Sequence, residues 1–146
     1  MLHTKTIWKK LAFAVATIGA TFSVALQAEQ QVLINLASGS GQTQGMALVL
    51  AGQMQQQGAK VSVLLCDSAG DIALKAYEGA TLQPMNATPA QLMGKFRQGG
   101  GVVQVCALYL PNKGITTEAL LEGITPAKPA DIATLMLAPE VKVFGF

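Results

Sequence analysis

Two cysteines, Cys66 and Cys106, are the residues of this chain with the chemistry of a nucleophile or a disulfide. Cys106 lies in the apolar run 102–110, which ends before a Pro-Asn-Lys-Gly segment. Cys66 ends an earlier apolar run, 60–66, and Asp67 follows it. A cysteine thiolate is a nucleophile, whereas a cysteine among apolar side chains behaves as a small core residue. Three roles are therefore open for Cys106: core packing, one half of a disulfide, or a reactive thiol at a strand end.

Histidine occurs once in the chain, at His3. Ser-His-Asp and Cys-His catalytic sites both need an imidazole to carry the proton. Zinc sites commonly use histidine as well, and two cysteines alone do not complete a typical zinc site. Once the N-terminal segment is removed, the remaining chain is expected not to be a hydrolase, and we expect no metal and no other cofactor.

The N-terminus has the pattern of a secretory signal peptide, predicted over residues 1–28. Its first ten residues include three lysines, an uncharged and mostly apolar run covers 11–26, and small residues precede Glu29. That run is shorter than the roughly 20 residues that a helix needs to span a bilayer. We expect cleavage after Ala28 or after Ala25, export to the periplasm or the medium, and no stable membrane insertion after cleavage.

Removal of this segment changes the charge balance. The full chain has 10 Lys and Arg residues and 8 Asp and Glu residues. Three of the ten, Lys5, Lys9 and Lys10, lie in the predicted signal peptide, so residues 29–146 keep seven basic against eight acidic residues, a formal charge of −1. Neither a basic stripe for nucleic acid nor a polybasic segment for a membrane surface remains. We therefore expect no nucleic-acid partner.

Residues 29–146 are predicted to form a single α/β domain. Apolar runs that predict strands cover 32–37, 60–66, 102–110 and 141–144. The first three are nearly continuous, which is typical of strands buried on both faces of a parallel sheet. We expect a three-layer fold, in which helices cover both faces of a mostly parallel sheet of four or five strands with a flavodoxin-like winding.

Helical patterns separate the predicted strands. They cover 42–57, 88–98, a short stretch from 117 to 121, and 129–137. Thr88 and Gln91 have the spacing of a capping box, and Pro89 stands at the first helical position between them. Residues 72–85 could form a short helix, a short strand or a loop that covers the site.

The two cysteines are predicted to lie on one rim of the sheet. In open α/β sheets the ligand crevice lies outside the carboxyl ends of the strands, and both cysteines stand near such ends. Asp67 and Asp71 follow the second strand, where they could bind a ligand or serve as turn and cap residues. Tyr109 and Asn112, which follow Cys106, are candidate binding residues together with Cys66 and Asp67.

A Cys66–Cys106 disulfide depends on the order of the strands. Neighbouring strands are about 4.8 Å apart, whereas an intervening strand would put the cysteines near 10 Å, beyond the Cα–Cα reach of roughly 7 Å. In the common doubly wound order, the first strand lies between the second and third. That order argues against a direct bridge unless the loops bend inward, although exported proteins with an even number of cysteines often pair them.

The segment "VVQVCALYLPNKGI" resembles the cysteine-bearing strand and loop of the DsrE/DsrF-like sulfur-relay family. In that family a cysteine follows a Val-rich strand and a glycine comes eight residues later, a spacing that Cys106 and Gly114 keep. "VKVFGF", residues 141–146, resembles the closing strand, and the resemblance extends from about 32 to 146. It implies a DsrE-like α/β domain, a persulfide at Cys106, protein or small-molecule persulfides as sulfur donors and acceptors, and a homo-oligomer, a trimer or hexamer.

The chemistry of sulfur transfer suits a chain without a catalytic imidazole, because thiolate attack on a persulfide needs no strong general acid. A free cysteine has a pKa of roughly 8.5, which a nearby cation lowers. Lys113 follows Cys106 by seven residues and is predicted to favour the thiolate, with the amide groups of the helix from residue 117. We expect Cys106 to accept a sulfur atom and to hand it on.

A non-catalytic binding module is the alternative. In that case the chain is an exported oligomer whose crevice binds a small molecule or a protein. Tyr109, Pro111 and residues 72–85 would form the binding surface, and the two cysteines would be structural or redox-paired.

Overall fold

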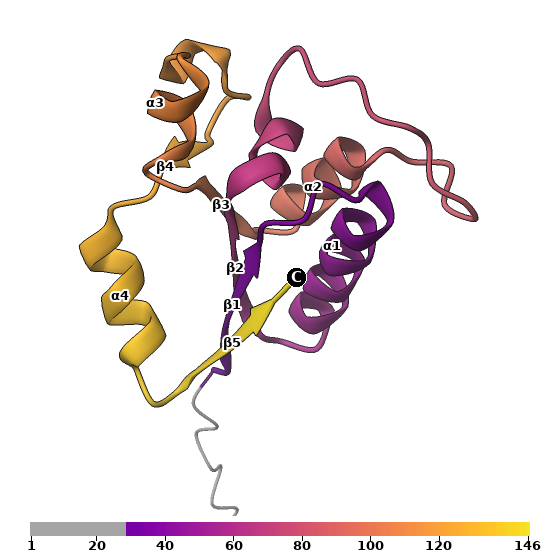
Figure 1. The fold of residues 1–146 in the computed structure, drawn as a ribbon. Coiled ribbons are helices and arrows are strands. Elements are labelled where there is room, and N and C mark those ends of the chain that lie inside the picture. The colour runs from indigo at the N-terminus through magenta and orange to yellow at the C-terminus, as the bar shows by residue number, and fades with distance from the viewer. Residues whose placement is uncertain (1–28) are drawn as a thin grey trace, which may run out of the picture.

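The computed structural model describes residues 29–146, so the predicted signal peptide lies outside the described residues. Within these residues, five strands and four α-helices follow one another, with two short 3-10 helices among them (Figure 1). Their bounds are β1 Gln31–Leu36, α1 Gly41–Gln56, β2 Lys60–Leu65, η1 Asp67–Ala73, α2 Pro89–Gln98, β3 Val102–Val105, α3 Tyr109–Lys113, η2 Thr117–Ala119, β4 Thr125–Pro126, α4 Pro129–Leu137 and β5 Val141–Gly145.

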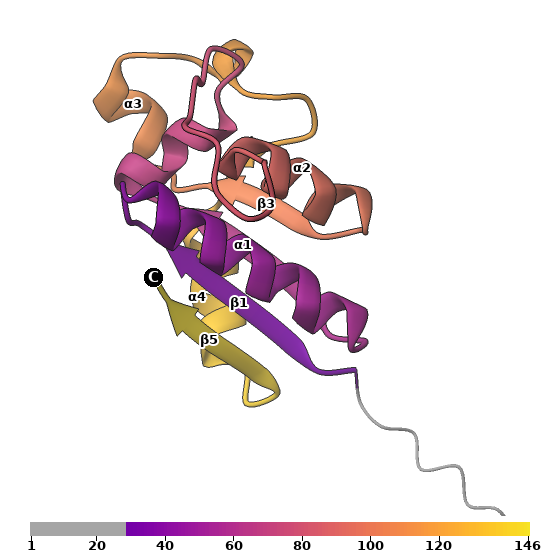
Figure 2. The same ribbon diagram turned by 90° about the vertical axis from the view of Figure 1, so that its right-hand side faces the viewer.

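The strands form a single parallel sheet in the order β4-β3-β2-β1-β5. Helices α1 and α2 cover one face of this sheet and α4 lies on the other, so the molecule has three layers (Figures 1 and 2). The predicted α/β class, a mostly parallel sheet of four or five strands with helices on both faces, is confirmed: the sheet has five strands and is parallel throughout.

The strand order differs from the flavodoxin-like order expected from the sequence. The expected order places β1 between β2 and β3. In the structure β2 lies between β1 and β3, because β1 pairs with β2 and β2 pairs with β3. From β1 the chain takes three steps in the same direction, to β2, β3 and β4, and it returns only at the end, when β5 pairs with the other edge of β1. Apolar runs identify buried strands, but they do not say which strand is whose neighbour.

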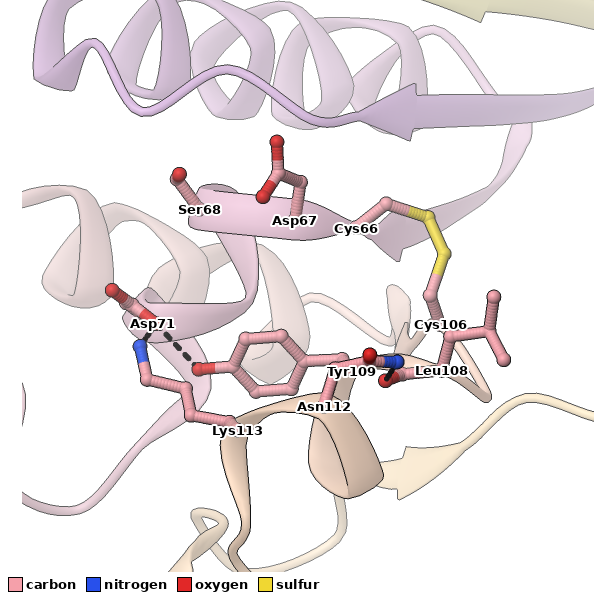
Figure 3. Close-up of a pocket in the computed structure, with 9 residues that line it drawn as sticks. All are labelled: Cys66, Asp67, Ser68, Asp71, Cys106, Leu108, Tyr109, Asn112 and Lys113. Carbon is pink, nitrogen blue, oxygen red and sulfur yellow. Dashed lines mark hydrogen bonds and ion pairs between the residues drawn. A yellow bond between two sulfur atoms is a disulfide. The ribbon is translucent and has the colours of Figure 1, made fainter.

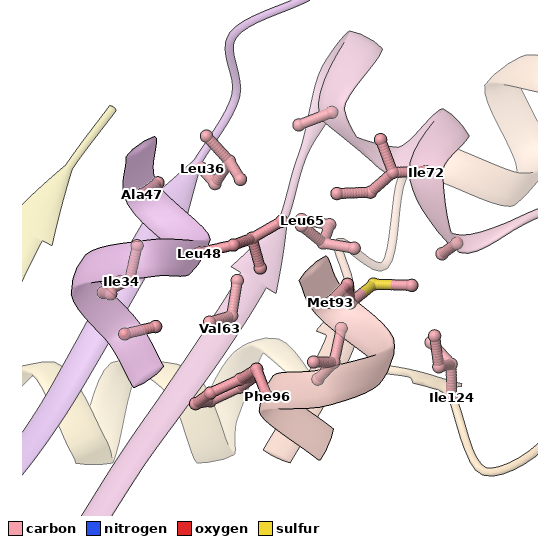
Figure 4. Packing of buried hydrophobic residues seen from close by; sticks show 14 of the residues in the cluster. Ile34, Leu36, Ala47, Leu48, Val63, Leu65, Ile72, Met93, Phe96 and Ile124 are labelled. Carbon is pink, nitrogen blue, oxygen red and sulfur yellow. The ribbon is translucent and has the colours of Figure 1, made fainter. Parts of the chain in front are cut away.

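The main core lies between the sheet and the helices α1 and α2 (Figure 4). Side chains alternate between the faces of a strand, so Val32, Ile34 and Leu36 of β1 point to this core while Leu33 points to the α4 face. Gln44 of α1 is buried and donates a hydrogen bond of 2.8 Å to the Ser38 carbonyl. Both faces of the central strands are covered, which explains their nearly continuous apolar runs.

Two helices follow their predictions closely. The capping box of α2 is present, since Thr88 Oγ1 accepts from the Gln91 backbone N–H and the Gln91 side chain accepts from the Thr88 N–H. The predicted helix over 129–137 is α4. Within residues 29–146, no helix combines the length and the apolar composition that crossing a membrane requires.

The region after β3 corrects the sequence prediction. The strand predicted over 102–110 ends at Val105, and residues Tyr109–Lys113 form the helix α3. Pro111 is compatible with this helix because it lies in the first turn, where a backbone N–H has no partner within the helix. Gly114 ends α3 at φ 66°, a left-handed conformation that favours glycine.

Three further segments were predicted only in part or not at all. The helix expected from residue 117 is the single turn η2, and the two-residue edge strand β4 was not predicted. Strand β4 has only two residues, one of them a proline, so it shows no alternation of apolar and polar residues from which a strand could be predicted. After η1 ends at Ala73, the ambiguous segment 72–85 is mostly loop, joined by single β-bridges from Leu74 to Leu120 and from Leu82 to Ala87.

Candidate functional site

The register of β2 and β3 brings the two cysteines together. Leu65 pairs with Val105, so the next residues along both strands, Cys66 and Cys106, face each other. Each continues the hydrogen-bond ladder by one residue, Cys66 N–H to the Leu36 carbonyl and Cys106 N–H to the Leu65 carbonyl, both at 2.8 Å. Their Cα atoms are 5.0 Å apart and their sulfur atoms form a disulfide.

This disulfide overturns the argument against a direct bridge. The strand order expected from the sequence places β1 between the two cysteine-bearing strands, whereas in the structure β2 and β3 are hydrogen-bonded neighbours. Side-chain alternation turns both cysteines toward the α4 face, where they pack against the cluster of Leu33, Leu64 and Ala127. Both cysteines remain only partly buried.

A cavity of about 660 Å³ opens beside the disulfide at the carboxyl ends of β2 and β3. The helical turns η1 and α3, which follow the two strands, form its walls (Figure 3). The lining residues are Cys66, Asp67, Ser68, Asp71, Cys106, Leu108, Tyr109, Asn112 and Lys113. The structure thus brings together all six residues predicted for the site, and it adds Ser68 and Leu108. Asp71, which the sequence left open as a ligand-binding or a turn residue, also lines the cavity.

Tyr109 is the best-anchored side chain of this cavity. Only 7% of the residue is exposed, and its hydroxyl donates a hydrogen bond of 2.5 Å to Asp71 Oδ1. The ring lies against Gly70, where a Cβ atom would be 2.4 Å from the ring carbon Cε2. Burial, together with the hydrogen bond to Asp71 and its charge, raises the pKa of Tyr109, so the hydroxyl stays protonated as a donor.

Lys113 lies over the same tyrosine and is paired with the same carboxylate. Its ammonium is 5.5 Å from the Tyr109 ring centroid and forms an ion pair with Asp71. Burial opposes ionisation of Asp71, but the hydrogen bonds from Lys113 and Tyr109 and the charge of Lys113 outweigh it and lower the pKa of Asp71. In Figure 3 this group lies at the end of the cavity away from the disulfide.

The structure therefore gives Lys113 a different neighbour from the one expected. Its ammonium is engaged by Asp71, and the predicted contact with the Cys106 thiolate would require Lys113 to leave that carboxylate. The amide groups expected from a helix at residue 117 belong to the single turn η2, which is not among the cavity walls. The role of Lys113 in favouring a thiolate remains a prediction.

Asn112 and Asp67 line the cavity in different ways. Asn112 Nδ2 donates 2.8 Å to the Leu108 carbonyl, so this side chain bonds within its own helical turn. Asp67 is exposed and has φ 46°, a left-handed conformation that aspartate and asparagine adopt more readily than most residues. It directly follows Cys66, and its carboxylate is drawn between Ser68 and the disulfide in Figure 3.

A second hollow, of about 300 Å³, lies on the α4 side of Cys106. All of its lining residues are apolar: Leu64, Cys106, Ala107, Leu108, Ala127, Pro129, Ile132, Ala133 and Met136. Cys106 and Leu108 line both hollows, so Cys106 can be approached from two sides. Of the two hollows, Cys66 lines only the larger one, the cavity beside the disulfide.

Comparisons with known proteins identify the fold. No protein-family model matches the chain, and no curated protein matches it. The crystal structure of the YchN protein from E. coli superposes with a TM-score of 0.67 at 17% identity, over 82% of this chain and 100% of that chain. The structure of MTH1491, a protein of unknown function from Methanobacterium thermoautotrophicum, gives 0.60 at 11% identity, over 81% and 100%. The fold is DsrE-like.

The DsrE-like fold agrees with the resemblance carried by the segment around Cys106. The pairing of Asp71 with Tyr109 and Lys113 was not predicted, because these two residues follow Asp71 by 38 and 42 positions in the sequence. Gly70 was missed for the same reason, since only the fold places Tyr109 against it. The usable signal was the position of Asp71, five residues after a cysteine that ends a buried strand.

Proposed function

We propose that this chain carries sulfane sulfur on Cys106 and that Cys66 is the second thiol of the same site. The observation that supports it is the pairing of the two cysteines at the mouth of a cavity on the carboxyl rim of a DsrE-like sheet. The disulfide is then the two-electron-oxidised form of the carrier. A dithiol protein or a small thiol must reduce it before sulfur can be loaded.

Loading and delivery are two displacements at sulfur. The Cys106 thiolate attacks the outer sulfur of a donor persulfide, so a bond from Cys106 to that sulfur forms and the donor leaves as a thiolate. An acceptor thiolate then attacks the same outer sulfur and releases Cys106 as a thiolate. Neither step needs an oxidant or a reductant, and neither needs an imidazole.

Cys66 supplies a third reaction when no acceptor arrives. Its thiolate attacks the inner sulfur of the Cys106 persulfide, forms the Cys66–Cys106 disulfide and expels hydrosulfide. The 5.0 Å Cα–Cα separation suits this bond. Cys106 is assigned as the carrier because it lines both hollows, so a donor and an acceptor can approach it from either side.

Mass spectrometry of the reduced protein after incubation with glutathione persulfide tests the proposal. We expect one added sulfur atom on the peptide that contains Cys106, no addition in Cys106→Ser, and longer retention of the sulfur in Cys66→Ser because the resolving thiol is gone. Equal loading of the Cys106→Ser and wild-type proteins would contradict the assignment.

A binding module with a structural disulfide is the second candidate. The observation that favours it is that both cysteines of the chain are in the Cys66–Cys106 bond. Tyr109, Asp67 and Asn112 would then contact the ligand in the cavity beside the disulfide. Under this function, Cys106→Ser would keep activity in the cell and Tyr109→Ala would lose it, the reverse of what a sulfur carrier requires.

The proposal includes the cellular setting. We propose that the chain is exported, which accords with a disulfide because such bonds persist in oxidising compartments. We propose further that it forms a homo-oligomer, which accords with the exposed apolar residues near α4. N-terminal sequencing of the purified protein tests the first point, and a start at Met1 would contradict it.

A further inference from the structure

The two cysteine-bearing loops are joined a second time, away from the disulfide. Each cysteine is followed by a helical turn that is hydrogen-bonded to the cysteine carbonyl, Ala69 N–H to Cys66 at 3.1 Å and Tyr109 N–H to Cys106 at 3.0 Å. The turn after Cys66 is η1 and the turn after Cys106 is α3. Any contact between these turns therefore restrains the backbones of the two cysteines.

Asp71 makes that contact. It belongs to η1, and it accepts hydrogen bonds from two residues of α3, the Tyr109 hydroxyl and the Lys113 ammonium. The Tyr109 ring closes the joint by packing against Gly70 of η1. We call Asp71, Tyr109 and Lys113 the Asp71 clamp (Figure 3).

We propose that Asp71 is a positioning residue for the cysteine pair: the clamp keeps η1 and α3 together when the disulfide is reduced, and so sets the equilibrium between dithiol and disulfide. This role rests on the proposed function, because the pair must cycle between those two states. It assigns Asp71 no contact with the transferred sulfur.

The physical basis is the effective concentration of one thiol at the other. Closing a disulfide in a loose chain costs conformational entropy, and the cost falls when the two thiols are already held near each other. The β2–β3 ladder holds the cysteine backbones from one side, and the clamp holds the turns that follow them from the other. Without the clamp the reduced loops gain freedom that disulfide formation must remove.

The two bonds of the clamp differ in strength. The Lys113 and Asp71 side chains are 41% and 37% exposed, so water weakens their ion pair. The Tyr109 hydroxyl is partly buried and donates to a charged acceptor, a kind of hydrogen bond that is stronger than a neutral one. We therefore expect the Tyr109–Asp71 bond to contribute the larger share.

The test is the equilibrium of the protein with glutathione. Two glutathione molecules reduce the disulfide and leave as one oxidised glutathione, so at half-reduction the concentration of oxidised glutathione divided by the square of the glutathione concentration gives the equilibrium constant. In Asp71→Asn the amide oxygen can still accept from Tyr109, but without a charge, and the ion pair with Lys113 is lost. We expect this variant to make the disulfide about fivefold easier to reduce, a loss comparable to that of one net hydrogen bond. Tyr109→Phe keeps the ring and the carboxylate and is expected to shift the equilibrium in the same direction.

Asp131→Asn in α4 is the matched control. It makes the same chemical change at an exposed residue that lines neither hollow. We expect the equilibrium constant of this variant with glutathione to stay within about twofold of the wild-type value, a smaller change than the loss of one net hydrogen bond would cause. A merely structural role of Asp71 would lower the melting temperature of the oxidised and reduced proteins equally and leave the equilibrium unmoved.

The proposal is overturned if Asp71→Asn and Tyr109→Phe both match the wild type, or if Asp131→Asn shifts the equilibrium as far as Asp71→Asn. Tyr109→Phe keeps the test open if Asp71→Asn does not fold. No sulfane sulfur enters this experiment, so its failure is distinct from failure of the proposed function. A wild-type protein that takes up no sulfur would refute the carrier and leave the clamp standing.

Discussion

At position 70 the absence of a side chain determines where Tyr109 can lie. A Cβ atom there would meet three ring atoms at 2.4 to 2.7 Å, closer than real contacts allow. Gly70→Ala must therefore displace the ring, and we expect it to destabilise the fold by about 1–3 kcal/mol, the usual effect of overpacking a buried site. Urea unfolding of the two proteins measures the difference.

The matched control for this change is Gly94→Ala in α2. A Cβ atom at Gly94 meets nothing within 4 Å, and alanine is the better helix former. We expect a gain of about 0.5–1 kcal/mol from this substitution. If both variants gained stability, the Tyr109 ring would have room that the structure does not give it.

Asp71 gives the stability of the molecule a dependence on acid. Its pKa in the folded protein is lowered below the ordinary 3.8, so its contribution is present above that value and is lost as pH falls through the lowered folded-state pKa. We expect wild type to unfold more easily as pH drops below about 4, and Asp71→Asn to lose less stability over that interval. Thermal unfolding of both proteins across pH 3 to 6 checks the sign, and parallel curves would contradict it.

Among the elements, the strands and helices that follow strong local patterns could be predicted from sequence. Helix α2 has its capping box and α4 begins at a proline, so the sequence alone predicts both helices. Helix α3 was missed because its residues continue an apolar run, and only the packing of Tyr109 on η1 decides that they turn. The sequence argued against the disulfide because the order of the strands in the sheet, which makes β2 and β3 neighbours, is set by tertiary packing and not by local patterns.

The bond between the ends of β2 and β3 is expected to stabilise the fold as well as to take part in its chemistry. It closes a loop of 40 residues, for which loop-closure entropy predicts a contribution of about 2–4 kcal/mol. A reductant should therefore lower the free energy of unfolding by this amount. The Cys66→Ser, Cys106→Ser double variant should not respond to reductant, and a response from it would show that the effect lies elsewhere.

Over the whole molecule, the two faces of the sheet are covered to different extents. Helices α1 and α2 bury the core on one face, whereas no residue of α4 is fully buried on the other. Leu137 of α4 is 84% exposed, and Val102 and Val143 face the same side of the sheet and are about half exposed. Leu108 beside the apolar hollow is 73% exposed. Apolar residues gathered on one face are typical of surfaces that bind a partner.

If the chain is a homo-oligomer, this apolar face is the surface on which copies meet. Leu137→Glu places a charge on it, and burial of an unpaired charge is costly, so we expect this variant to shift toward the monomer in light scattering after size-exclusion chromatography. Met46→Glu is the control, because Met46 is 52% exposed on α1, on the opposite face of the sheet. A wild-type monomer at micromolar concentration would refute the oligomer. Equal dissociation by the two variants would place the contact elsewhere.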